Sequence, residues 1–133
     1  MRLSNRLKKI AELIPDGSVV ADVGTDHAYL PVYCLEKGKI RSAIAMDVNE
    51  GPLASAAENS TKYGVSQLVD LRLSDGLERL KYGEADVIVI AGMGGLLIKR
   101  ILESGRDKLA DGTLLLLQPM IAQEELRKYL YTS

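Results

Sequence analysis

The sequence of 133 residues has one cysteine, one histidine, no tryptophan and no phenylalanine, and its six tyrosines are its only aromatic residues. The single cysteine, Cys34, excludes an internal disulfide and suits a reducing compartment, so we expect a cytoplasmic protein. No apolar run approaches the roughly 20 residues of a membrane helix. Because no second His or Cys stands at ligand spacing, we expect no metal site.

The sequence also has no large excess of positive or negative charge. The net charge at pH 7 is −1, and only 5% of the residues are aromatic. The chain therefore lacks both the basic surface of a self-sufficient nucleic-acid binder and an aromatic platform for single strands. Hydrophobic residues make up 47% of the sequence, which favours a folded core over disorder. The length predicts one domain.

The sequence does contain five short apolar runs, each followed at once by polar or glycine residues. In an open parallel α/β sheet, ligands bind in the crevice beyond the carboxyl ends of the strands. Five such clusters after five predicted strands therefore indicate one small-molecule site. The runs are 18–23, 42–47, 68–73, 86–91 and 113–117, and the clusters are 24–27, 47–49, 75–76, 92–95 and 118–119.

Predicted helices separate these runs. Leu3, Leu7, Ile10 and Ile14 follow the helical period and predict an amphipathic first helix that Pro15 ends. The same criteria predict further helices over 28–37, 52–64, 97–105 and 121–130. Alternating strands and helices imply an α/β fold, a doubly wound parallel sheet with right-handed crossovers.

The apolar patterns also predict the strand order. The run 68–73 alternates between apolar and polar residues, as at a sheet edge, whereas 86–91 is continuously apolar, as in a central strand. These patterns fit the order 3-2-1-4-5. The run 113–117 is as apolar as a central strand, yet no further strand follows it. We therefore expect residues 1–133 to be the front part of a longer protein whose remaining strands are missing here.

The stretch that begins at Asp22 carries the first cluster. Gly24 permits a tight turn after the strand. The dinucleotide fingerprint G-x-G-x-x-G would require glycine at the positions of Asp26 and Tyr29. An acid at 26 repels a pyrophosphate but suits a cationic ligand, such as the amino and sulfonium end of S-adenosylmethionine. Alternatively, Asp26 only caps the following helix.

The only histidine, His27, lies in the same cluster. At the mouth of the first strand it could orient a substrate or relay a proton. A purely structural role is the alternative.

The acids after the second and third strands predict nucleoside contacts. Asp47, followed by Val48, stands where an acid accepts hydrogen bonds from ribose hydroxyls, and this spacing serves NAD and S-adenosylmethionine equally. Asp75, with Gly76 allowing the turn, could accept a hydrogen bond from an adenine amine. An ordinary Asp-Gly turn is the alternative.

The last two clusters predict the substrate side. Gly92, Gly94 and Gly95 surround Met93, so the fourth strand ends with little side-chain bulk. This leaves space for a flat group, with Met93 as a flexible apolar contact, although tight loop packing would explain the glycines too. Gln118 and Pro119 end the fifth strand and are predicted to line the substrate, unless Pro119 only starts the last helix.

Taken together, these motifs resemble those of the class I S-adenosylmethionine-dependent methyltransferases. More narrowly, the chain resembles the bacterial tRNA adenine-N1 methyltransferases that act at position 22 of tRNA. The matching stretches are LSNRLKKIAELIP, ADVGTDHAYLP, AIAMD, GP at 51–52, DGL at 75–77, IAGMGG and LQP.

The resemblance implies S-adenosylmethionine as cofactor and an adenine N1 in tRNA as target. It also implies that tRNA is held mainly by a helical C-terminal region absent from these residues. N1 has a free lone pair, so no strong base is required, and Asp26 with His27 beside it is the candidate catalytic group. The alternatives are an NAD-type dehydrogenase, which the glycine fingerprint disfavours, and a non-catalytic S-adenosylmethionine-binding module.

Overall fold

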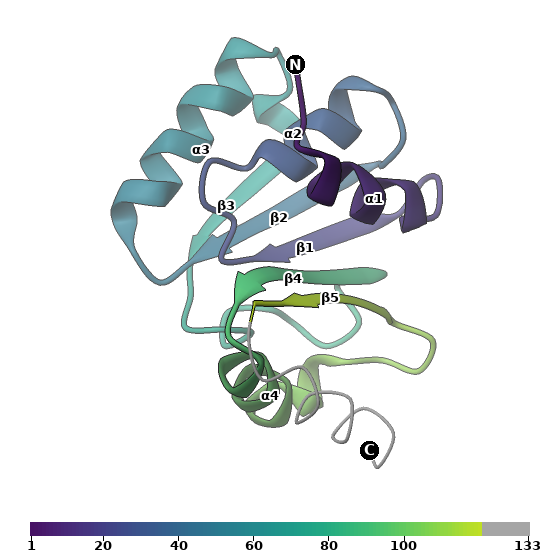
Figure 1. The fold of residues 1–133 in the computed structure, drawn as a ribbon, viewed down its shortest axis with the longest axis vertical. Coiled ribbons are helices and arrows are strands. Elements are labelled where there is room, and N and C mark those ends of the chain that lie inside the picture. Colours follow the sequence, from purple (N-terminus) through teal and green to yellow (C-terminus); the bar gives the residue numbers. More distant parts are fainter. Residues whose placement is uncertain (121–133) are drawn as a thin grey trace.

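The computed structural model describes residues 1–120, which form a five-stranded parallel sheet in the order β3-β2-β1-β4-β5 (Figure 1). The predicted fold class and strand order are confirmed. The strands are β1 Val19–Val23, β2 Ser42–Asp47, β3 Val69–Leu73, β4 Val87–Met93 and β5 Leu114–Pro119. The helices are α1 Asn5–Leu13, α2 Tyr29–Glu36, α3 Glu50–Lys62 and α4 Gly95–Ser104, with short 3₁₀ turns at Ser66–Leu68 and Arg106–Lys108.

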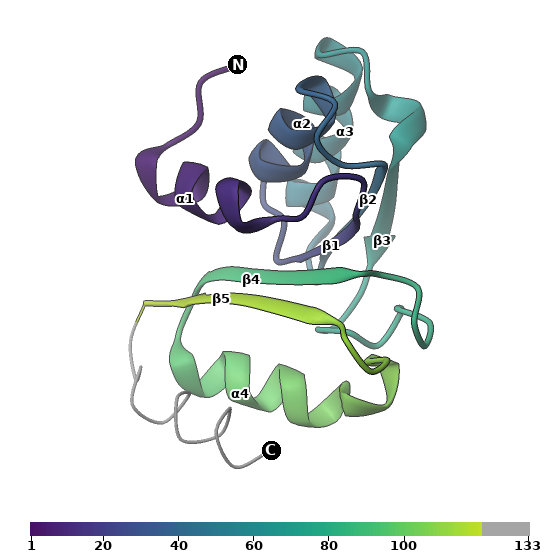
Figure 2. The same ribbon diagram turned by 90° about the vertical axis from the view of Figure 1, so that its right-hand side faces the viewer.

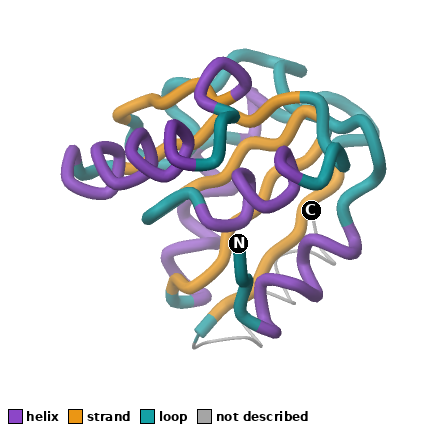
Figure 3. The backbone as a smooth tube through the Cα atoms, turned by 90° about the horizontal axis from the view of Figure 1, so that it is seen from above, coloured by secondary structure: helices purple, strands orange, loops and turns teal. Residues whose placement is uncertain are grey.

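Helices cover both faces of the sheet. Figure 2 shows α1, α2 and α3 on one face and α4 on the other, and Figure 3 shows the strands running side by side. Each strand sends alternate side chains to the two cores. In β1, for example, Val20 packs with the α1–α3 side and Ala21 with the α4 side, and both are fully buried. Packing on both faces therefore fixes the positions of the residues that follow the strands at the carboxyl edge of the sheet.

The element bounds differ from the predictions mainly at that edge. β4 and β5 each run two residues further than predicted, because a bulge at Gly92 (φ 76°) lets the ladder continue from the Ala91–Gln118 pair to the Met93–Pro119 pair. Helix α3 begins at Glu50, two residues before the predicted start at Pro52. The predicted helix over 121–130 lies outside the described residues.

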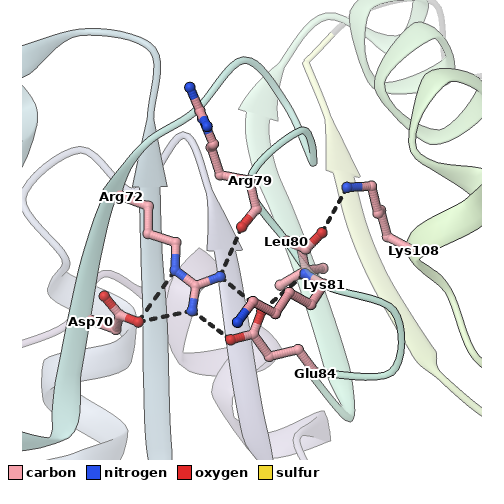
Figure 4. A network of polar contacts seen from close by, with 7 residues as sticks. All are labelled: Asp70, Arg72, Arg79, Leu80, Lys81, Glu84 and Lys108. Carbon is pink, nitrogen blue, oxygen red and sulfur yellow. Dashed lines mark hydrogen bonds and ion pairs between the residues drawn. The ribbon is translucent and has the colours of Figure 1, made fainter.

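The alternation in β3 was misleading at one residue. It placed Arg72 on the wetter face, yet the side chain of Arg72 is only 18% exposed, whereas Leu73 is 50% exposed. Arg72 makes a two-pronged ion pair with Glu84 and also binds Asp70 and the carbonyl of Arg79 (Figure 4). The network fastens the long β3–β4 connection to β3 at the sheet edge.

Within residues 1–120, no helix is both long and apolar enough to cross a membrane.

Candidate functional site

The carboxyl ends of β1, β2 and β4 open into a cavity of about 550 Å³, a volume typical of small-molecule sites. The clusters after these three strands meet there, as the parallel topology predicts. Of the predicted site residues, seven line the cavity: Asp22, Gly24, Asp26, Asp47, Val48, Gly92 and Met93.

Asp22 is the most perturbed group in the cavity wall. The residue is 6% exposed, and its carboxylate accepts a hydrogen bond of 2.8 Å from Thr25 Oγ1. Burial raises the pKa of Asp22 to about 7; the Thr25 hydrogen bond opposes this rise, and the charges of Asp47 and Asp26 add to it. A positively charged ligand in this cavity would favour the ionised form of Asp22.

The loop after β1 has an unusual backbone. Gly24 has a φ of 70°, and two residues that are not glycine, Asp26 (φ 55°) and Ala28 (φ 59°), also lie in the left-handed region. That conformation costs roughly 1–2 kcal/mol for each such residue. Strain of this kind persists only where its surroundings enforce it, and it is concentrated at functional sites.

Hydrogen bonds from neighbouring elements hold this loop. The N–H groups of Gly24 and Thr25 donate to the carbonyl of Met46 at 2.8 and 2.9 Å, and Asn59 Nδ2 of α3 donates to the carbonyl of His27 at 2.8 Å. The residue that caps α2 is Ala28, with no side-chain cap. Asp26 therefore does not cap the helix, and its exposed carboxylate lines the cavity instead.

His27 sits beside the cavity rather than in its lining. Its Nε2 lies 3.5 Å from Asp26 Oδ1, and its ring centroid lies 5.0 Å from that of Tyr29. Its roles in orienting a substrate or relaying a proton stay predictions.

Asp47 lines the same cavity at the end of β2, the strand next to β1. The residue is 9% exposed, and its Oδ1 accepts a 2.9 Å hydrogen bond from the N–H of Asn49. The neighbouring Val48 is 61% exposed and also lines the cavity. This is a fixed carboxylate beside an apolar side chain, an arrangement suited to a ribose and the edge of a base.

Asp75 and Gly76 lie apart from the main cavity. They line a neighbouring cavity of about 350 Å³, and among the described residues only Ile101 lines both cavities. The chain turns at the buried Ser74, whose hydroxyl donates to the carbonyl of Gly76 and accepts the N–H of Arg79. Ser74 itself lines the main cavity. The adenine contact assigned to Asp75 stays a prediction.

The predicted substrate side is only partly in the cavity. Gly94 caps α4 and Gly95 is buried at its first position, and neither lines the cavity. Gln118 and Pro119 belong to β5 and do not line it either. Met120 lines it instead, and its N–H donates to the carbonyl of Met93 at 2.8 Å.

Sequence reasoning missed several lining residues. Arg6 and Leu7 of α1 reach the cavity, and Arg6 is the only cationic side chain among the described lining residues. The amphipathic pattern of α1 predicted its buried face but did not predict that Arg6, on the polar side of the helix, reaches the cavity. Tyr29 also lines the cavity, and the sequence pattern marked it only as a position where the glycine fingerprint fails.

The sheet order and the acid-lined cavity at its carboxyl edge define a Rossmann-like protein built to bind a nucleoside-containing ligand. Residues 3–133 match the family model described as a methyltransferase domain, and the chain belongs to that family.

Three comparisons illustrate the similarity. The chain is 49% identical over 131 residues to tRNA (adenine(22)-N(1))-methyltransferase of Bacillus subtilis (strain 168). The match covers 98% of this chain and 55% of the relative. The crystal structure of the B. subtilis tRNA methyltransferase TrmK matches with a TM-score of 0.94 at 49% identity, over 98% of this chain and 56% of that one. A Streptococcus pneumoniae structure in complex with S-adenosyl-L-methionine matches with a TM-score of 0.90 at 42% identity, over 97% of this chain and 61% of that one. The chain thus spans little more than half the length of these relatives.

Proposed function

We propose that residues 1–133 form the S-adenosylmethionine-binding domain of a methyltransferase that acts on N1 of an adenine in tRNA. The observation that carries the proposal is the set of three carboxylates, Asp22, Asp26 and Asp47, around one cavity at the carboxyl edge of the sheet. Such an acidic lining favours a cationic ligand over a dinucleotide with its pyrophosphate. The similarity to a B. subtilis enzyme of that name supports the choice of substrate.

In this proposal Asp47 accepts hydrogen bonds from the ribose hydroxyls of the cofactor. The loop from Gly24 to Asp26 holds the methionine end, where the sulfonium charge meets the acidic wall. Asp75 and Gly76, which line the neighbouring cavity, are proposed to contact the adenine where it reaches beyond the main cavity. Met93, whose side chain reaches the space above Gly24, borders the substrate side together with Gly94, Gly95, Gln118 and Pro119.

The chemistry is a direct methyl transfer. The lone pair on adenine N1 attacks the methyl carbon, the carbon–sulfur bond breaks, and its electron pair stays on sulfur as the thioether of S-adenosylhomocysteine. No proton has to leave N1, so positioning supplies most of the rate acceleration. The product base is cationic, and Asp26, with His27 beside it, stabilises the developing charge.

The tRNA is proposed to be held mainly by a helical C-terminal region, beyond the span that this chain shares with its relatives. The net charge of −1 supports this division, because phosphate contacts by lysine and arginine dominate nucleic-acid affinity. The reaction is proposed to take place in the cytoplasm.

The test is methylation of an unmodified tRNA transcript by the full-length protein that contains this chain. Nuclease digestion and mass spectrometry of nucleosides should show 1-methyladenosine at position 22, and a transcript with guanine there should show none. Product at another base or atom would contradict the proposed target. Cofactor binding without transfer to any tRNA would instead favour the non-catalytic module, and binding of NAD in its place would favour a dehydrogenase.

The role of Asp26 has its own test. Asp26→Asn should lower the single-turnover rate of transfer about tenfold or more, while the cofactor dissociation constant changes much less, because the charge acts mainly in the transition state. A fully active Asp26→Asn protein would remove Asp26 from the mechanism.

A further inference from the structure

Tyr29 is an exposed aromatic side chain at the cavity. It is 43% exposed although it is the first residue of α2, and it lines the cavity together with Asp26. Its ring lies 5.0 Å from the ring of His27, with an angle of 37° between the two planes. A chain with so few aromatic residues thus places two rings side by side where the acidic loop meets solvent.

The position of Tyr29 is fixed from both sides. The residue before it, Ala28, is fully buried in the left-handed conformation, and its N–H donates to the carbonyl of Thr25 at 3.0 Å. The residue after it, Leu30, is 3% exposed and packs in the core. Asn59 holds the carbonyl of His27. The ring of Tyr29 is therefore carried by a rigid backbone, as a preorganised binding surface requires.

We propose that Tyr29, supported by His27, is the surface on which the target nucleobase stacks during methyl transfer, an inference that rests on the proposed function. The N1 atom of adenine lies on its pairing edge, so the base has to leave its stack before it can react. A tyrosine face replaces part of the lost stacking, and such contacts contribute about 1–3 kcal/mol per base.

The chemistry of the product strengthens this assignment. Methylation at N1 gives the purine ring a positive charge, and a cation is attracted to the face of an aromatic ring. The contact with Tyr29 therefore becomes stronger as the methyl group is transferred. An interaction that is stronger in the transition state than in the ground state raises the rate constant as well as the affinity.

The experiment compares Tyr29→Ala and Tyr29→Phe in the full-length protein that contains this chain. Tyr29→Ala should lower kcat/KM for tRNA by about 10- to 100-fold, with part of the loss in kcat. Tyr29→Phe keeps the ring and should stay within about threefold of the wild type. The dissociation constant for S-adenosylmethionine should change by less than about twofold in both variants. Tyr82→Ala is the matched control, because Tyr82 is 69% exposed and lines neither cavity.

Two results would overturn the inference while the proposed function stands. One is a folded Tyr29→Ala protein, verified by its melting temperature, that is as active as Tyr29→Phe. The other is a loss of cofactor affinity as large as the loss of kcat/KM, which would place Tyr29 against the cofactor. A wild-type protein that transfers no methyl group to tRNA would overturn the proposed function, and the inference with it.

Discussion

The methyl end of Met93 fills the space above Gly24. A Cβ atom on residue 24 would lie 2.2 Å from Met93 Cε, far inside any van der Waals contact. Gly24 directly follows β1, Met93 ends the neighbouring strand β4, and both residues line the main cavity. Gly24 therefore serves two needs at once: its φ of 70°, and the close approach of a side chain from the next strand.

These two needs can be separated by mutation. We expect Gly24→Ala to lower the free energy of unfolding by about 1–2 kcal/mol, because the left-handed conformation is unfavourable for alanine. Most of this cost should persist in a Met93→Ala background, since the end of Met93 can swing aside but the backbone cannot. Urea unfolding of the two single variants and the double variant measures it. A penalty that disappears in the double variant would show that the contact, and not the backbone, requires glycine.

Asp22 should make the stability of the protein depend on pH. Its pKa is raised to about 7 in the folded protein, whereas an unfolded chain releases this proton near its usual pKa of about 4. Between about pH 4 and pH 7 the folded state therefore binds more protons, and this contribution to stability falls as the pH rises, then levels off above about 7.

Asp22→Asn removes that titration. The free energy of unfolding of the variant minus that of the wild type should therefore increase between pH 5 and pH 8, by on the order of 2–3 kcal/mol. Denaturant unfolding at several pH values gives the comparison, and the difference between the two proteins cancels the titration of all other groups. Parallel profiles for variant and wild type would contradict the perturbed carboxyl.

The ion pair of Arg72 and Glu84 should give stability the opposite dependence on pH. Hydrogen bonds from Arg72 lower the pKa of Glu84 to about 2, so its stabilisation is present above about pH 4.5 and is lost as the pH falls toward 2. Glu84→Gln should lower the free energy of unfolding at neutral pH by about 1–2 kcal/mol, the scale of hydrogen bonds to charged groups.

The exposed Glu58 of α3 supplies a matched control for this prediction, because Glu58→Gln makes the same chemical change on an open helix surface. At pH 7 the free energy of unfolding should be lower for Glu84→Gln than for Glu58→Gln. At pH 3 the difference between the two variants should be smaller. Equal stability of the two variants at pH 7 would show that the network in Figure 4 does not stabilise the fold.

The sequence predicted the sheet and much of the cavity because both follow from local patterns. Apolar runs identified the strands, and the parallel topology brought the residues after β1, β2 and β4 to one edge. Gly24, Asp26 and Asp47 could therefore be assigned to one site before their positions were known, although their roles stay predictions.

Other features depend on partners distant in sequence. The burial of Arg72 requires Glu84, twelve residues away in a connection without regular structure. The position of Arg6 depends on how α1 crosses the sheet, which its own periodicity does not specify. The separation of Asp75 from the main cavity follows from the turn at Ser74, which an Asp-Gly pair alone does not predict.

The most direct test of the account is a calorimetric titration of this chain with S-adenosylmethionine, beside its Asp47→Ala variant and beside NAD. We expect the wild type to bind S-adenosylmethionine in preference to NAD. Loss of the ribose contacts in a folded Asp47→Ala protein should weaken binding by about 1.5–3 kcal/mol, roughly 10- to 150-fold. Equal affinity in the variant, or preference of the wild type for NAD, would contradict the assignment of this cavity.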